Sequence, residues 1–291
     1  MPELPEVETI ARDLRAHLEG ARIAAARVVK PDILRRIGRR AFERGLAGRR
    51  IEVVGRRAKH LVVELDDGRR LVVQPRMTGA FLVDERLVRD PYTAFELRLD
   101  TGKRLRYRDV RRLGVVFLLT PRQWADYDGA IGPEPLAPDF TAERFAAALG
   151  RGSVAVKKAL MDQHRLAGVG NIYANEALWL TGIDPSRGVA RLTRDELGRL
   201  HAAVLDVLAR AIEGRGTTVR DYRTGTGEPG GFQGRLAVYG REREPCLRCA
   251  RRIVLTHAID ARATYFCPGC QRKRSPKRCP RQRRSTRCGG W

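Results

Sequence analysis

Two pairs of cysteines near the C-terminus are the strongest chemical signal in this 291-residue sequence. Each pair has the form C-x-x-C, and 17 residues separate one pair from the other. This doubled spacing is typical of a ribbon in which two hairpin turns close on one tetrahedral Zn²⁺ ion, and four thiolates leave no open position for catalysis. We therefore predict one structural zinc ion, rather than two redox pairs, held by Cys246, Cys249, Cys267 and Cys270.

The N-terminal residues Met1-Pro2-Glu3 could carry nucleophilic chemistry. Removal of Met1 would expose a secondary amine at Pro2, and α-amino groups have an ordinary pKa of roughly 7.7–8.0, against about 10.4 for lysine. When such an amine attacks a sugar carbon, the iminium that forms stays cationic and acts as an electron sink for elimination. Glu3 could move protons beside it. A proline at position 2 is inert in most proteins, so this interpretation depends on the rest of the sequence.

Four further residues could contact phosphate groups. Asn171 follows Gly168-Val-Gly170 and is expected to cap a helix that begins near Ile172, which would expose backbone N–H groups to an anion. Lys157 and Lys158 lie in the preceding helix, and we expect them to help hold one DNA strand. Arg262 lies near a predicted hairpin tip between the cysteine pairs, where it is either a phosphate contact or a solvated charge.

Periodic patterns predict the elements that position these residues. Apolar residues recur at helical spacing from Leu4 to Leu18, and the period changes toward two between residues 22 and 119. Within that stretch, Asp67-Gly68 and Thr101-Gly102 each predict a β-hairpin. Four prolines and two glycines interrupt residues 120–140, after which helical spacing returns in 142–149, 154–161, 172–180 and 192–212. We expect an α+β multidomain fold with these parts: an N-terminal β-sandwich with a leading helix (1–120), a hinge (121–140), a helical domain (141–240) with a glycine-rich loop (214–234), a zinc finger (241–273) and a disordered basic tail (274–291).

The charge balance indicates an anionic partner. The chain has 57 Lys and Arg against 34 Asp and Glu, a formal net charge of +23. Nucleic acid is the leading candidate, and an anionic membrane surface, which would not explain the zinc ribbon, is the second. No run of 18 apolar residues predicts a membrane span, and the acidic start of the chain does not resemble a signal peptide. Because all six cysteines follow position 245, they indicate metal ligands in a reducing cytoplasm rather than disulfides of a secreted scaffold.

Seven segments, in this order, resemble the formamidopyrimidine-DNA glycosylase family, which includes endonuclease VIII. They are Pro2 to Thr9, Arg57 to His60, Arg76 to Gly79, Asp109 to Arg112, Gly168 to Tyr173, Tyr239 to Arg241 and the four-cysteine ribbon. The resemblance covers residues 2 to about 273. It implies a helix-two-turns-helix arrangement in the helical domain and double-stranded damaged DNA bound between the two domains.

The resemblance also implies roles for single residues. Pro2 matches the nucleophile, Glu3 the proton donor, and Lys59 a lysine assigned to phosphate contact and β-elimination. Arg262 matches an arginine linked to phosphate binding and δ-elimination, and Asn171 a phosphate-binding asparagine. Tyr92 matches a position with a DNA-contacting side chain, Met77 and Leu113 match wedge residues, and Arg111 matches the residue that holds the orphaned base. Arg220 and Tyr222 belong to the loop that, by this resemblance, closes over an oxidised purine.

The implied activity is base excision repair of oxidised purines, chiefly 8-oxoguanine and formamidopyrimidines. A bifunctional glycosylase and class I lyase of this kind releases the base and cuts the strand by β,δ-elimination. Leu113 replaces a usual phenylalanine, so a specialist for oxidised pyrimidines is the alternative within the family. A non-catalytic damaged-DNA-binding protein is the alternative outside it, although a pure binder has no need of a secondary amine at Pro2. We expect a monomer in a bacterial cytoplasm, associated with the nucleoid through DNA.

Overall fold

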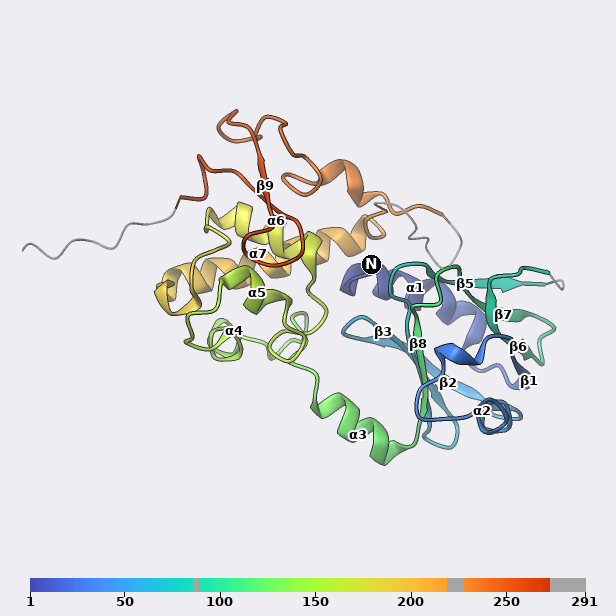
Figure 1. Ribbon diagram of the computed structural model, residues 1–291. Helices are drawn as coiled ribbons and strands as arrows, with labels where there is room; N and C mark the ends of the chain where they lie inside the picture. The colour runs from blue at the N-terminus through green and yellow to red at the C-terminus, as the bar shows by residue number, and fades with distance from the viewer. Residues whose placement is uncertain (86–88, 219–227, 273–291) are drawn as a thin grey trace, which may run out of the picture.

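The computed structural model describes residues 1–85, 89–218 and 228–272. Figure 1 shows a β-rich N-terminal domain on one side and a helical domain on the other, with a small C-terminal hairpin against the helical domain. Within these described residues, no helix combines the length and apolar character needed to cross a membrane.

The N-terminal domain is a sandwich of two four-stranded antiparallel sheets, with strand orders β1-β6-β7-β5 and β2-β3-β4-β8. The two predicted hairpins pair as expected, because β3 joins β4 around Asp67-Gly68 and β6 joins β7 around Thr101-Gly102. In chain order its elements are α1 (Leu4–Leu18), β1 (Ile23–Val28), the 3-10 helix Pro31–Ile33, α2 (Arg39–Leu46), β2 (Ile51–Arg57), β3 (His60–Leu65), β4 (Arg70–Gln74), β5 (Gly79–Asp84), β6 (Thr93–Leu99), β7 (Arg104–Asp109) and β8 (Val115–Leu119).

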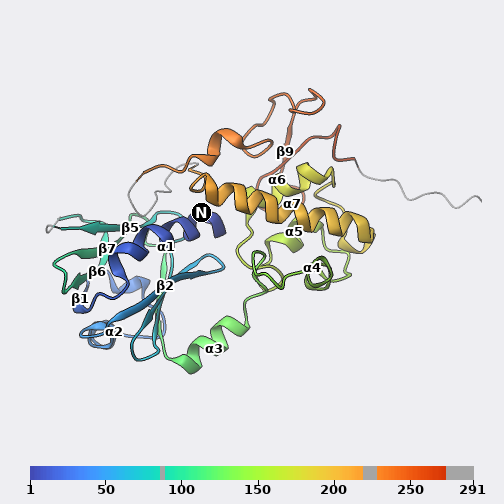
Figure 2. The same ribbon diagram turned by 180° about the vertical axis from the view of Figure 1, so that it is seen from behind.

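Helix α1 belongs to both hydrophobic cores. Its first residue, Leu4, is buried in the core of the helical domain, whereas Val7, Ile10 and Leu14 are buried in the core of the sandwich. Figure 2 shows α1 between the sandwich and the long helix α7 (Arg194–Glu213). The residues just before α1 are therefore held at the junction of the two domains.

The segment between the domains contains a helix where the sequence predicted only a hinge. Helix α3 (Pro121–Gly129) begins at a capping box, in which Thr120 accepts a hydrogen bond from the Gln123 N–H and the Thr120 N–H donates to the Gln123 side chain. Pro121 occupies the first turn, where its missing N–H costs no hydrogen bond. Pro121 thus marks the start of a helix, whereas the other three prolines lie in the irregular chain that follows it.

The helical domain and the zinc-finger hairpin complete the described chain. Helices α5 and α6 are joined by the tight turns of residues 162–170, and α6 packs against α7 and against β10. Strands β9 and β10 form an antiparallel hairpin between the two cysteine pairs. The elements are α4 (Ala142–Leu149), α5 (Val156–Met161), α6 (Asn171–Thr181), the 3-10 helix Val189–Arg191, α7 (Arg194–Glu213), the 3-10 helix Phe232–Arg235, β9 (Val254–Thr256) and β10 (Thr264–Phe266).

Candidate functional site

Glu3 lies where the two domains meet, and its carboxylate is held by the helical domain. Its Oε1 accepts a hydrogen bond from the backbone N–H of Ile172, at 2.9 Å, in the first turn of α6. A Cβ on Gly170 would lie 2.4 Å from the Glu3 carboxyl carbon, which explains the glycine at this position. Glu3 Oε2 is buried and has no hydrogen-bond partner among the described residues. One carboxylate oxygen is therefore fixed, and the other is available to a reacting group.

This arrangement corrects the prediction that Asn171 caps α6 and exposes the helix end to phosphate. The N-cap residue is Gly170, and Asn171 is the first residue of the helix. A helix N-terminus attracts an anion, and here the anion is the carboxylate of Glu3. The Asn171 side chain instead donates to the carbonyl oxygen of Ala263, at 3.0 Å.

Glu6 forms a second buried carboxylate next to Glu3. It accepts hydrogen bonds from the Glu3 N–H at 2.8 Å, from the Thr217 N–H at 2.8 Å and from the Tyr173 hydroxyl. Burial, followed by the nearby charge of Glu3, raises the pKa of Glu6 to about 7. Glu6 thus joins the start of α1 to α6 and to the base of the glycine-rich loop.

Lys59 lies in the turn between β2 and β3 and is buried. Burial lowers the pKa of its ammonium group, the negative charge of Glu3 raises it, and the positive charge of Arg262 lowers it. The structure therefore brings Lys59, Glu3 and Arg262 within electrostatic reach of one another. Pro2 is also buried, immediately before Glu3, whereas Met1 is half exposed.

The segment between the domains forms hydrogen bonds and ion pairs with the residues on both sides of Lys59. Glu134 accepts a hydrogen bond from the Ala58 N–H at 2.5 Å and pairs with the guanidinium groups of Arg56 and Arg57, at 2.8 and 3.1 Å. On the other side of Lys59, His60 accepts a hydrogen bond from the Tyr127 hydroxyl of α3 at 3.0 Å. Burial lowers the pKa of His60 to about 4, so this histidine is neutral and can accept that bond.

Lys157 is not available to DNA, contrary to the sequence prediction. It is fully buried, and its Nζ donates to the carbonyl oxygen of Ala263 at 3.1 Å and to the hydroxyl of Thr264 at 2.7 Å. Its neighbour Lys158 is exposed. Lys157 therefore fastens the zinc-finger hairpin to α5, and with Asn171 it fixes the backbone directly after Arg262.

Arg262 itself is exposed at the hairpin, with 60% of its side chain accessible and Asp260 3.8 Å away. Arg262 is thus an exposed cation, with Asp260 as its ion-pair partner, at a hairpin end that Lys157 and Asn171 hold in place. Its position is consistent with the predicted phosphate contact.

Four predicted DNA contacts project from the loops of the sandwich. The predicted contacts Met77, Tyr92 and Leu113 are exposed by 37%, 42% and 46%. Arg111 is exposed, and its Nη1 lies 3.5 Å from the Met77 sulfur. The Arg108 guanidinium lies over the Tyr92 ring, 5.0 Å from its centroid. These side chains occupy neighbouring turns, as a wedge into DNA would require. The predicted contacts Arg220 and Tyr222, and the basic tail 274–291, lie outside the described residues.

The four cysteines of the ribbon form one compact cluster. All four sulfur atoms lie within 4.8 Å of one another, with Cys246 and Cys270 at 3.8 Å and Cys249 and Cys267 at 3.4 Å. Such spacings fit four ligands of one tetrahedral ion, because Zn–S bonds are about 2.3 Å long. The Trp179 indole N–H donates to Cys246 Sγ at 3.4 Å and ties the cluster to α6. The sulfur set is that of a closed, structural metal site.

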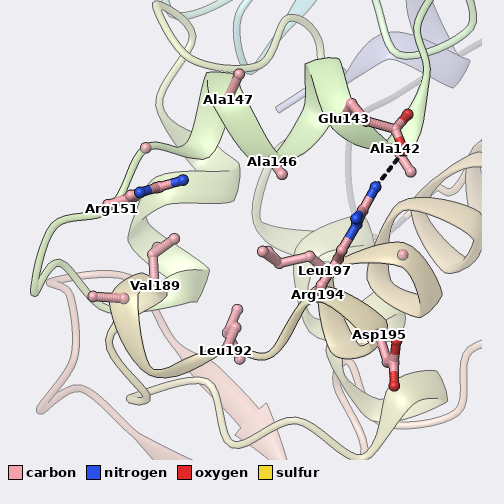
Figure 3. Close-up of a pocket in the computed structure, with 13 residues that line it drawn as sticks. Ala142, Glu143, Ala146, Ala147, Arg151, Val189, Leu192, Arg194, Asp195 and Leu197 are labelled. Carbon is pink, nitrogen blue, oxygen red and sulfur yellow. Dashed lines mark ion pairs between the residues drawn. The ribbon is translucent and has the colours of Figure 1, made fainter.

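A separate hollow of about 1020 Å³ lies in the helical domain between α4 and the start of α7 (Figure 3). Ala146, Val189 and Leu197 line it, and Arg194 pairs across it with Glu143 at 3.5 Å. None of the predicted site residues that the structure describes lines this hollow. It is therefore not part of the site at the domain junction.

The sequence prediction omitted four residues that hold the site together: Glu6, His60, Asp109 and Glu134. Glu6 alone had a visible signal, since Glu3-x-x-Glu6 before an apolar periodic run has the spacing of a helix capping box. His60 and Asp109 lie in segments that resemble the family and Glu134 does not, but the contacts of all three with Tyr127, Thr78 and Ala58 join residues distant in the sequence.

Comparisons with known proteins agree with this architecture. A family model described as the formamidopyrimidine-DNA glycosylase N-terminal domain matches residues 1–116, and one described as the H2TH domain of the same enzyme matches residues 131–223. A formamidopyrimidine-DNA glycosylase from Chloroflexus aurantiacus is 45% identical over 273 residues, which cover 93% of this chain and 98% of that protein.

Solved structures give the same result. The chain is similar to a Lactococcus lactis FPG mutant in complex with DNA containing Fapy-dG, with 33% identity and a TM-score of 0.87 over 94% of this chain and 100% of that one. It is also similar to the MutM (FPG) protein of Thermus thermophilus, with 40% identity and a TM-score of 0.82 over 93% and 98% of the two chains. The similarity extends over both domains and the cysteine cluster.

Proposed function

The chain belongs to the formamidopyrimidine-DNA glycosylase family, and from this premise we propose how the residues at its domain junction carry out the reaction. It is a DNA glycosylase that excises oxidised purines in base excision repair. Its substrate is double-stranded DNA containing damaged bases, which it meets as a monomer in the bacterial cytoplasm. The net charge of +23 favours that association at long range.

The first step is attack by Pro2. Once Met1 is removed, the Pro2 nitrogen bonds to C1′ of the damaged nucleotide, the bond from C1′ to the base breaks, and the base leaves with a proton. Glu3 moves the required protons through its unpaired Oε2, while the Ile172 N–H holds Oε1 in place. Loss of the amine proton and opening of the sugar ring give an iminium between Pro2 and C1′.

The second step is cleavage of the strand. The iminium acidifies C2′, so loss of a C2′ proton expels the 3′ phosphate, and loss of a C4′ proton then expels the 5′ phosphate. Lys59, which is buried and feels the charge of Glu3, contacts phosphate and promotes the β-elimination. Arg262 binds the phosphate that leaves in the δ-elimination. The β-elimination is the class I lyase step, and with the δ-elimination both bonds from the sugar to its phosphates are broken.

Before the chemistry, the damaged base must leave the helix, which costs a few kcal/mol. Met77 and Leu113 fill the space that it vacates, and Arg111 holds the orphaned base. Tyr92 and Asn171 contact the strand beside the lesion. In the glycine-rich loop, Arg220 and Tyr222 close over the extruded base.

The four-cysteine cluster holds one Zn²⁺ ion. Its four sulfur atoms fit the donor type, number and spacing that zinc prefers, and an ion with four protein ligands has no open position for substrate. Bound zinc supplies rigidity to the hairpin that presents Arg262. Cys246, Cys249, Cys267 and Cys270 are its ligands.

The observation that carries this proposal is the buried, unpaired oxygen of Glu3 next to Pro2, with the buried Lys59 near enough for the charge of Glu3 to shift its pKa. The test uses purified protein, a duplex with 8-oxoguanine opposite cytosine, and sodium borohydride. We expect a covalent protein–DNA adduct from the wild-type protein and its loss in Pro2→Gly, which lacks the secondary amine. A wild-type adduct only on oxidised pyrimidines would overturn the purine preference, and no adduct on any lesion or abasic site would overturn the mechanism.

A further inference from the structure

Asp109 is a buried carboxylate that the reaction described above does not use. It ends β7 and is inaccessible to solvent. Its Oδ1 accepts a hydrogen bond from the Thr78 hydroxyl at 2.5 Å, and its Oδ2 accepts one from the Gly114 N–H at 2.7 Å. Thr78 directly follows Met77, and Gly114 directly follows Leu113. One carboxylate therefore joins the two turns that carry the wedge.

The same network reaches the other two predicted DNA contacts of this domain. The Thr78 hydroxyl accepts a hydrogen bond from the Arg111 N–H at 3.0 Å, and the Asp109 N–H donates to the carbonyl oxygen of Tyr92 at 2.9 Å. Met77, Tyr92, Arg111 and Leu113 are thus each within one residue of a group bonded to Asp109 or Thr78. The bonds to Asp109 and Thr78 therefore fix the positions of these side chains relative to one another, although they lie on separate turns.

The two wedge turns also need such support because their backbones are strained. Arg76 has φ +55° and Arg112 has φ +53°, in the left-handed region that side chains with a Cβ disfavour. The turns approach closely around Tyr107, since a Cβ on Gly79 or Gly114 would lie 2.3 or 2.0 Å from its hydroxyl oxygen. A strained conformation of this kind persists only where neighbouring groups hold it.

We propose that Asp109, acting through Thr78 and Gly114, is the positioning residue of the wedge and sets the rate at which the enzyme opens duplex DNA around a lesion. This inference rests on the proposed function, because it assigns Asp109 a role in extruding the base that Pro2 then attacks. Asp109 does not touch the reacting atoms. Its effect should appear only where stacked, paired DNA must be opened.

The test compares Asp109→Asn and Thr78→Val with a matched control, Asp84→Asn. Asp84 lies on the adjacent strand of the same sheet and pairs with Arg106, so its loss reports general weakening of the sheet. An asparagine at 109 can accept from only one of the two donors. A valine at 78 has nearly the shape of threonine but breaks the link between Asp109 and Arg111 while leaving the bond to Gly114.

Two substrates separate opening from chemistry. On duplex DNA with 8-oxoguanine, we expect Asp109→Asn and Thr78→Val to slow single-turnover excision at least about tenfold, since small misplacements of positioning groups have effects of this size. Fluorescence of 2-aminopurine next to the lesion should rise correspondingly more slowly. Borohydride trapping on a single-stranded abasic oligonucleotide, which needs no opening, should stay within about twofold of wild type.

Equal losses on both substrates, or no loss on the duplex for Thr78→Val when that variant melts like wild type, would overturn the positioning role. Slowing by Asp84→Asn equal to that of Asp109→Asn would also overturn it, since the effect would then come from the sheet as a whole. Failure of the proposed function looks different, because the wild-type protein itself would then form no adduct on the abasic oligonucleotide.

Discussion

The backbone N–H of Ile172 donates a hydrogen bond to Glu3 Oε1 across the domain junction, at 2.9 Å. Glu3 precedes the first helix of the sandwich, whereas Ile172 lies in the first turn of α6 in the helical domain. The bond orients one carboxylate oxygen and leaves the second, buried oxygen without a partner. Because Leu4 is packed in the helical core, the N-terminus cannot move independently of α6. The reacting end of the chain is therefore aligned by the domain it does not belong to.

Glu3→Gln tests the role of the free oxygen. The amide oxygen can still accept the bond from Ile172, but the amide cannot transfer a proton. We expect base release from an 8-oxoguanine duplex to slow by about 10²–10⁴-fold, the usual contribution of a general acid or base. Borohydride trapping at a preformed abasic site should fall less, because no base has to leave. Glu8→Gln on the same helix is the control, and an unchanged rate of base release in Glu3→Gln would contradict the assignment.

His60 predicts a specific pH dependence of stability. Its pKa falls from 6.5 to about 4 on folding, chiefly through burial, so the unfolded chain takes up a proton between these values and the folded chain does not. Stability should therefore be unaffected by His60 above pH 6.5 and should decrease as the pH falls toward 4. At about 1.4 kcal/mol for each pH unit, the free energy of unfolding should fall by roughly 3 kcal/mol between pH 6.5 and 4.

His60→Gln is the comparison that isolates this effect. Glutamine can donate to the Arg57 carbonyl oxygen and accept from the Tyr127 hydroxyl, as His60 does, and it does not titrate. Urea unfolding at several pH values should show the difference in unfolding free energy between the two proteins changing only below pH 6.5, in favour of the variant. A constant difference from pH 4 to 8 would show that His60 is not held neutral.

Lys157→Met distinguishes a fastening role from a phosphate contact. Methionine fills similar space but loses the hydrogen bonds to Ala263 and Thr264, so we expect the melting temperature to fall by an amount equivalent to about 1–3 kcal/mol. The slope of log Kd against log salt concentration should not change, whereas loss of a phosphate contact reduces it by about 1. Lys158→Met, at the exposed neighbour, is the matched control, and a reduced slope in Lys157→Met would restore the original prediction.

The sequence predicted those features that local patterns encode. Apolar spacing gave α1 and the helices of the second domain, two turn dipeptides gave the hairpins, and cysteine spacing gave the metal cluster. Each of these signals lies within about 25 residues of chain, so tertiary contacts are not needed to read it. The family followed from motifs whose order and types are specific, such as Pro2-Glu3 with Lys59.

The predictions that failed depended on contacts between distant segments. Lys157 and Lys158 look alike in the sequence, but adjacent helical residues point about 100° apart, so only one of them can face solvent when α5 packs against the finger. Asn171 seemed a cap because the carboxylate that occupies the helix end, Glu3, is 168 residues away. Asp109 lies in a segment that resembles the family, but its bond to Thr78, like the bond of Glu134 to Ala58, joins residues that become neighbours only in the folded chain.

Cys249→Ala tests the metal and what it supports. Loss of one of the four ligands should release the ion. The remaining cysteine sulfurs lie within 4.8 Å of one another and would repel as thiolates without a cation, so the hairpin should then open. We expect wild-type protein to contain one zinc per chain by atomic absorption, and the variant to contain little. Because Trp179 donates a hydrogen bond to Cys246, the fluorescence of Trp179 should change in the variant. Binding to abasic-site DNA should weaken, because Arg262 loses its fixed position. Cys279→Ala, outside both cysteine pairs, should keep the metal, and full zinc content in Cys249→Ala would refute the four-cysteine site.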